Sequence, residues 1–152
     1  DAASGGPTDS KFLAFVTSTV TNVTGDGTQY NLTGAIWTEV FDTGSDVVNG
    51  TFTAPETGQY LLSAKFALSG FTSNNTGVDV AIVTSNRTYR MRTNGYAMIN
   101  GTWSELFLNV AVVADMDTSD TAYMWTQVYA TDKGVDVVGT TVGTVFSGAL
   151  LA

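Results

Sequence analysis

The stretch Thr51-Phe-Thr-Ala-Pro-Glu-Thr-Gly-Gln-Tyr-Leu-Leu-Ser-Ala-Lys-Phe66 sets the pattern for the whole chain. Pro55 and Gly58 bracket a tight turn, because proline presets φ and glycine accepts a positive φ at little cost. After Gly58 the side chains alternate, with Tyr60, Leu62, Ala64, Phe66 and Leu68 on one face and Leu61, Ser63, Lys65, Ala67 and Ser69 on the other. This period of two predicts a long central strand with one apolar face.

The composition excludes several kinds of chemistry. The 152 residues suit a single domain and include neither Cys nor His, so disulfides, thiolate metal sites and Ser-His or Cys-His catalytic pairs are ruled out. The net charge is −8, and the basic cluster of Arg87, Arg90 and Arg92 is too small for a phosphate-binding face. We therefore expect no nucleic-acid partner and no cofactor. We also expect no membrane insertion, because no apolar run approaches the ~18 residues that a spanning helix needs.

Alternating segments continue on both sides of the central stretch. Segments that read as strands cover residues 11–20, 30–36, 37–41, 47–54, 78–84, 88–99, 102–116, 121–130 and 142–152. Asn100-Gly101 is a strong hairpin signal. About eight to ten strands without helices predict an all-β fold, an antiparallel jelly-roll sandwich. Residues 1–10 are small and polar and are predicted to be a linker or disordered tail, which leaves 11–152 as the head domain.

Four motifs occur in order along this domain. They are Phe12, then Phe52-x5-Gly58-x-Tyr60-x-Leu62, then Met116-Asp-Thr-Ser-Asp120-Thr-Ala-Tyr123, and finally Thr144-Val-Phe146-Ser-Gly148-Ala-Leu150-Leu151. Together they resemble the complement C1q globular-head family, relatives of the tumour necrosis factor (TNF) fold, and look most like its phage and bacterial versions. The chain departs from the pattern at Leu62, Ala64 and Ser119. The loop at 93–101 lacks the acidic residues with which some animal members bind calcium, so no calcium site is carried over.

The resemblance implies a compact homotrimer with the first, central and last strands packed about the threefold axis. The residues support this independently, because several strands carry apolar side chains on both faces, more than one sandwich core explains. We expect the surplus side chains to form the trimer interface: Leu13, Phe15, Leu61, Ala111, Val113 and Phe146.

Candidate binding and catalytic residues are sparse. Asp115, Asp117 and Asp120 could offer oxygen ligands to a hard cation, but a turn is the favoured interpretation. Arg90 and Arg92 point to one strand face and suit either an anionic ligand or ion pairs between subunits. Ion pairs with the excess acids are the favoured interpretation. Tyr96 and Trp103 could contact a ligand, whereas Trp125 alternates within a strand and is expected to be packed. Six Asn-x-Thr sequons are interpreted as turn residues: Asn22, Asn31, Asn49, Asn74, Asn86 and Asn100.

Three functions follow from these observations. The preferred hypothesis is a non-enzymatic trimeric head of an extracellular or virion-surface fibre or spike protein, which binds a host-cell glycan or protein. The alternative is a capsid or head-decoration protein that contacts other virion subunits. A polysaccharide-cleaving enzyme that uses carboxylate pairs is the least favoured. Its candidate acids, which are interpreted as turn and rim residues, are Asp26, Glu39, Asp42, Asp46, Glu56 and Glu105.

Overall fold

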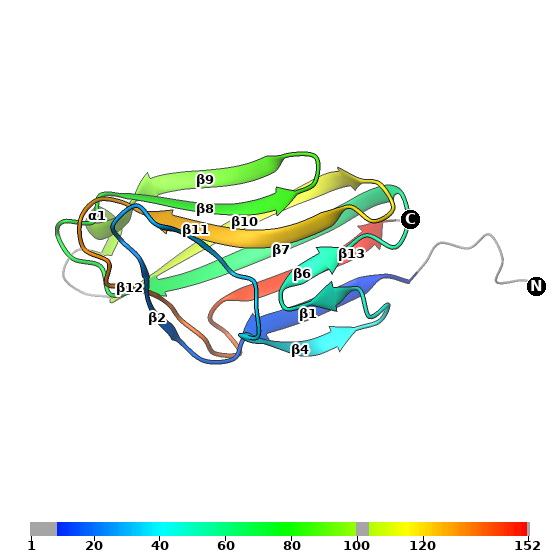
Figure 1. Ribbon diagram of the computed structural model, residues 1–152, viewed down its shortest axis with the longest axis horizontal. Helices are drawn as coiled ribbons and strands as arrows, with labels where there is room; N and C mark the ends of the chain where they lie inside the picture. Colours follow the sequence, from blue (N-terminus) through cyan, green and yellow to red (C-terminus); the bar gives the residue numbers. More distant parts are fainter. Residues whose placement is uncertain (1–8, 100–103, 152) are drawn as a thin grey trace, which may run out of the picture.

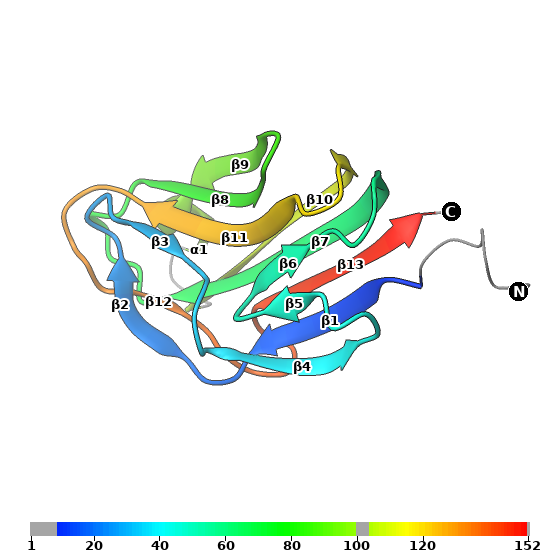
Figure 2. The same cartoon turned by 45° about the vertical axis from the view of Figure 1, so that its right-hand side comes forward.

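Two antiparallel sheets pack face to face in the computed structural model, which describes residues 9–99 and 104–151 (Figure 1). The described residues form thirteen strands and one short helix. The fold is therefore the all-β jelly-roll sandwich that the alternating pattern predicts. Figure 2 turns the molecule so that the two layers are seen apart.

The large sheet has seven strands. In spatial order they are β2 (Val20–Thr24), β12 (Val135–Val137), β7 (Gly58–Ser69), β13 (Val145–Leu151), β1 (Lys11–Val16) and β4 (Trp37–Asp42), with β10 (Glu105–Met116) paired along all of β7. The small sheet runs β5 (Val47–Val48), β6 (Thr51–Thr53), β11 (Thr121–Val128), β8 (Gly77–Thr84) and β9 (Thr88–Asn94), and β3 (Gln29–Asn31) also pairs with β11. The first, central and last strands thus lie side by side.

The central strand β7 divides its side chains as predicted. Tyr60, Leu62 and Phe66 are fully buried between the sheets, whereas Leu61 points outward with 43% of its surface exposed. The Tyr60 hydroxyl donates a hydrogen bond of 2.6 Å to the Glu56 carbonyl, which ties the preceding turn to the strand. The stretch that contains the turn therefore supplies both the middle of the core and one outward-facing row.

The prediction that Phe146 belongs to the outward-facing set is wrong. Phe146 lies opposite Ala64 of β7, on the core side of the sheet, and it is fully buried. Its ring makes an edge contact with Phe12, with centroids 5.1 Å apart, and Phe12 stacks on Phe52 of the small sheet at 4.9 Å. These rings form the aromatic centre of the core.

The predicted strand over 88–99 is only partly correct. β9 ends at Asn94, and a helix α1 (Gly95–Ile99) follows. The backbone packs closely against neighbouring side chains there, since a Cβ added to the buried Gly95 would lie 2.6 Å from Val78 and 3.0 Å from Phe71. In the described part of the chain no helix is long and apolar enough to span a membrane. The predicted Asn100-Gly101 turn lies outside the described residues.

The strand β1 starts and β13 ends at the same end of the sandwich (Figure 1). Ser10, just before β1, is already part of the fold, because it is buried and donates a 2.8 Å hydrogen bond to Asp46. Loops gather at the opposite end, where the buried Asn75 amide donates to the carbonyls of Gly25 at 3.0 Å and Asp132 at 3.2 Å. One side chain thus joins three loops there.

Candidate functional sites

The outward side of the large sheet carries an apolar face. It comprises Leu13, Phe15, Leu61, Phe107, Ala111 and Val113, on β1, β7 and β10. Val113 lies directly opposite Leu61, and both are exposed, at 54% and 43%. Leu13 and Phe15 are half-buried. An exposed apolar patch of this kind on a folded domain is a signature of an interaction surface.

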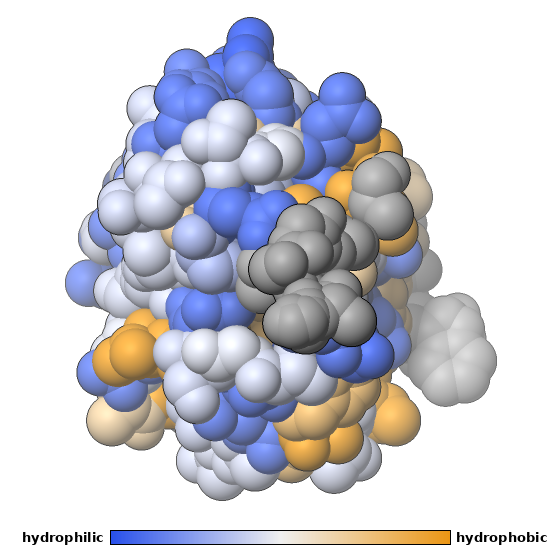
Figure 3. Space-filling model, turned by 90° about the vertical axis from the view of Figure 1, so that its right-hand side faces the viewer, coloured by the Kyte–Doolittle hydropathy of each residue, from blue (hydrophilic) through white to orange (hydrophobic). Residues whose placement is uncertain are grey.

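A shallow groove runs through this apolar face. It has a volume of about 340 Å³ and lies between β1, β4, β7 and β13, lined by Leu13, Phe41, Leu61, Ser63, Ser147 and Ala149 among others. Figure 3, seen from the end that carries both termini, shows hydrophobic side chains along its right-hand edge, on the side of the large sheet, while the upper left is hydrophilic. The predicted interface residues other than Phe146 therefore face outward together. Whether they form an interface stays a prediction.

The outward side of the small sheet carries a charged cluster. Asp79 of β8 is fully buried, and both of its oxygens accept hydrogen bonds from Arg92 of β9, at 2.6 and 2.8 Å. The Tyr129 hydroxyl donates a third bond at 3.2 Å, and Arg90 lies 3.8 Å away. These bonds from Arg92, aided by Tyr129 and the two positive charges, hold the pKa of Asp79 below its usual value although burial opposes the shift. Arg90 and Arg92 therefore share one face, as predicted, but the acid they pair with belongs to their own chain and not to another subunit.

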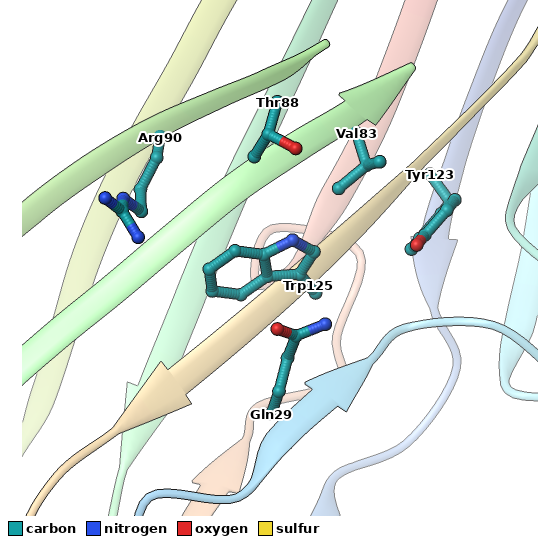
Figure 4. Close-up of a pocket in the computed structure, with 6 residues that line it drawn as sticks. All are labelled: Gln29, Val83, Thr88, Arg90, Tyr123 and Trp125. Atoms are coloured by element: carbon teal, nitrogen blue, oxygen red, sulfur yellow. The ribbon is translucent and has the colours of Figure 1, made fainter. Parts of the chain in front are cut away.

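A polar hollow of about 630 Å³ opens beside this cluster. It is lined by Gln29, Val83, Thr88, Arg90, Tyr123 and Trp125, which come from β3, β8, β9 and β11. Trp125 is 6% exposed, which agrees with the prediction that it is packed. Its indole lies between Arg90 and Gln29, with Thr88, Val83 and Tyr123 around it (Figure 4). The sequence reveals Arg90 but not the hollow, because residues of four strands meet there.

The two aromatic residues predicted to contact ligand have different outcomes. Tyr96 lies half-buried on α1 and lines a hollow of about 360 Å³ with Ser73, Asn75, Thr76 and Asn94 at the end of the sandwich opposite the termini. Trp103 lies outside the described residues. Its predicted role stays a prediction.

Two of the three aspartates weighed as cation ligands, Asp115 and Asp120, have separate partners. Asp115 binds the Arg87 guanidinium through both oxygens, at 2.7 and 2.6 Å. Asp120 accepts from the Asn86 amide at 3.2 Å and from the backbone N–H of Asp117 at 2.9 Å. Among the described residues no three His, Cys, Asp or Glu side chains are grouped so that they could hold a metal ion.

Two of the acids weighed as catalytic pairs, Asp42 and Asp26, stabilise turns. Asp42 accepts from the backbone N–H groups of Asp46 and Val47, both at 2.9 Å. Asp26 accepts from the hydroxyl and the backbone N–H of Thr28, and these bonds lower its pKa. Glu105 lines a different hollow, beside Met98 and Ile99. This arrangement fits turn chemistry better than a pair of carboxylates that flank a substrate.

Several solved structures are similar to this chain in fold. The globular domain of zebrafish complement 1qA has a TM-score of 0.62 and 14% identity, and the match covers 94% of this chain and 98% of that one. Murine APRIL has a TM-score of 0.62 and 14% identity, and the match covers 95% of this chain and 100% of that one. The Eiger TNF of S. frugiperda has a TM-score of 0.59 and 10% identity, and the match covers 96% of this chain and 94% of that one. No family model and no curated protein matches the chain. The chain thus has the C1q/TNF-like jelly-roll fold.

Proposed function

We propose that this chain is the non-enzymatic head domain of an extracellular or virion-surface protein, which assembles as a homotrimer and binds a ligand on another surface. The observation that carries the proposal is the apolar face on β1, β7 and β10. Leu61, Phe107 and Val113 are all exposed there, at 43%, 51% and 54%. Covering such side chains with a second copy removes apolar surface from water at about 25 cal/mol per Å².

The chemistry of this face suits a copy of the same chain. Its apolar side chains surround a groove that is mostly apolar, so the face offers both protruding side chains and a depression for them. Lys65 of β7 lies beside this face and already has partners within its own chain. Its ammonium donates to the Val142 carbonyl at 2.6 Å and lies 5.2 Å from the centre of the Phe107 ring. When a second copy covers this face, the Lys65 ammonium therefore keeps these two partners and is not buried without one.

The arrangement of β1 and β13 is compatible with a head domain that is attached to the rest of a fibre or spike at one end. Because β1 starts and β13 ends at one end of the sandwich, a segment joined to either of them leaves from that end. The opposite end, with its loops and Tyr96, stays free to meet a ligand, as loops on a rigid scaffold commonly do. A fibre or spike tip of a virion is the setting that we favour for such a head.

The test is the mass of the domain in solution. We expect sedimentation velocity at micromolar concentration to give a trimer for the unaltered chain and a folded monomer for Leu61→Asp and Val113→Asp. Val48→Asp is the matched control, because Val48 of β5 is 67% exposed on the other sheet. A monomeric unaltered chain, or Leu61→Asp trimers as stable as those of Val48→Asp, would refute the proposal.

A further inference from the structure

The polar hollow on the small sheet lies away from the apolar face, so both surfaces can be occupied at once. Its volume, about 630 Å³, falls in the ~300–1,000 Å³ range of small-ligand sites. Hydroxyl and amide groups of Thr88, Tyr123 and Gln29 surround the indole of Trp125 (Figure 4). The lining therefore combines several neutral hydrogen-bonding groups with two aromatic side chains, Tyr123 and Trp125, and one cation.

The charges beside the hollow do not balance. Asp79 has one negative charge and two arginines near it, and Arg92 occupies both of its oxygens. Arg90 stands 3.8 Å from that carboxylate, beyond hydrogen-bond distance, and its side chain is half exposed. Arg90 therefore keeps N–H donors for another acceptor, and the cluster has a net charge of about +1 in a chain of net charge −8.

We propose that the polar hollow binds a carboxylate-bearing sugar, with the carboxylate on Arg90. The guanidinium matches a carboxylate in geometry and charge. The sugar hydroxyls are satisfied by Thr88, Tyr123 and Gln29, and one C–H edge of the ring contacts the small part of the Trp125 indole that is exposed. The inference rests on the proposed function for the claim that this domain binds a surface ligand, and it adds the site and the ligand class.

Assembly would multiply a weak single site. Arg90 is half exposed, so one sugar binds with millimolar rather than micromolar affinity. Three copies on a trimer would engage a surface rich in acidic sugars with a gain of roughly 10²–10⁴ in avidity.

The experiment is an NMR titration of the ¹⁵N-labelled full chain with three probes. D-Glucuronate carries the carboxylate and the hydroxyls, D-glucose lacks the carboxylate, and acetate lacks the hydroxyls. The Trp125 indole N–H signal, assigned with Trp125→Phe, reports on the hollow. We expect saturable shifts with glucuronate at millimolar concentration, and binding at least roughly tenfold weaker for the other two.

Two arginine variants test the role of Arg90. Arg90→Gln should weaken glucuronate binding roughly tenfold or more. Arg87→Gln is the control, because that guanidinium binds Asp115 of β10, and it should bind as the unaltered chain does. Absence of saturable glucuronate binding, equal binding of glucose or acetate, or unchanged binding by Arg90→Gln would each overturn the proposal.

Sedimentation of the same samples separates the two proposals. A monomer whose Trp125 signal shifts with glucuronate supports the site and refutes the trimer. A trimer whose signal does not shift refutes the site and leaves the trimer standing.

Discussion

Replacing Asp79 with asparagine tests the cluster that joins β8, β9 and the end of β11. The carboxylate is fully buried and accepts two bonds from Arg92 and one from Tyr129. The Arg92 guanidinium also lies 6.0 Å from the centre of the Tyr129 ring. Asparagine has nearly the same shape, but it loses the charge and one acceptor oxygen, so the change removes the electrostatics and leaves the packing.

The expected loss follows from these bonds. A hydrogen bond to a charged group contributes ~1.5–3 kcal/mol, and the amide oxygen of asparagine retains part of one. Both arginine side chains are half exposed and regain water when the carboxylate is gone, so the cost stays below the ~3–5 kcal/mol of a fully enclosed pair. We therefore expect Asp79→Asn to lower the free energy of unfolding by about 2 kcal/mol near neutral pH, and Tm by roughly 4–8 °C.

The pH dependence gives the prediction a second arm. A carboxyl group whose folded pKa is depressed stabilises the protein above its unfolded pKa, and this contribution is lost as the pH falls through the folded pKa. The pKa of Asp79 is held below the ordinary 3.8, chiefly by the bonds from Arg92. The difference in the free energy of unfolding between the unaltered chain and Asp79→Asn should therefore have its full value at pH 6 and become smaller once the pH drops below 3.8.

Urea unfolding at fixed protomer concentration measures this difference at pH 6 and at successively lower pH. Asp117→Asn is the control, since Asp117 is exposed and the substitution changes the charge equally. Other carboxylates with lowered pKa, such as Asp26 and Asp132, affect all three proteins alike. The reasoning would be refuted if Asp79→Asn lowered the free energy of unfolding no more than Asp117→Asn does. It would also be refuted if the difference in this free energy between the unaltered chain and Asp79→Asn stayed constant down to about pH 2.5.

Three further substitutions test the fold. Phe146→Ala should cost about 3–5 kcal/mol in urea unfolding, because the ring fills the core against Phe12, and a cost under ~1 kcal/mol would mean that it faces outward. Asn75→Ala should cost about 2–3 kcal/mol and speed hydrogen exchange in the three loops that its side chain joins, and unchanged exchange would contradict this. Tyr60→Phe should cost about 1 kcal/mol by thermal unfolding through the lost bond to Glu56, and an unchanged Tm would show that this bond contributes nothing.

The fold could be predicted because the central strand β7 alternates clearly between apolar and more polar side chains. The period of two over β7 separates Tyr60 and Leu62 from Leu61 without any tertiary information. The sequence does not show which face Phe146 occupies, because its strand has Gly148 and small residues near it and both faces read as apolar. Phe146 lies on the core side because it pairs with Ala64 of β7, and this register depends on how the two strands pair in the folded protein.

The sites were harder to predict than the sheets. Arg90 and Arg92 were recognisable, since two residues with spacing two share a strand face. Their partner Asp79 also leaves a signal, as a lone acid in the otherwise apolar strand β8. The polar hollow leaves no signal in the sequence, because it depends on how β3 and β11 pair and on the small side chain of Ala81 opposite Trp125.

The place of β13 in the large sheet has a consequence for biosynthesis. β13 pairs with both β1 and β7. During synthesis β1 is made long before residues 145–151, so it cannot pair with β13 until the end of the domain has been translated. Until then, β1 and β7 keep unpaired edges next to apolar side chains, which is the condition that chaperones recognise and that promotes aggregation. Chains that stall before residue 145 should therefore be degraded or aggregate rather than accumulate as partly folded heads.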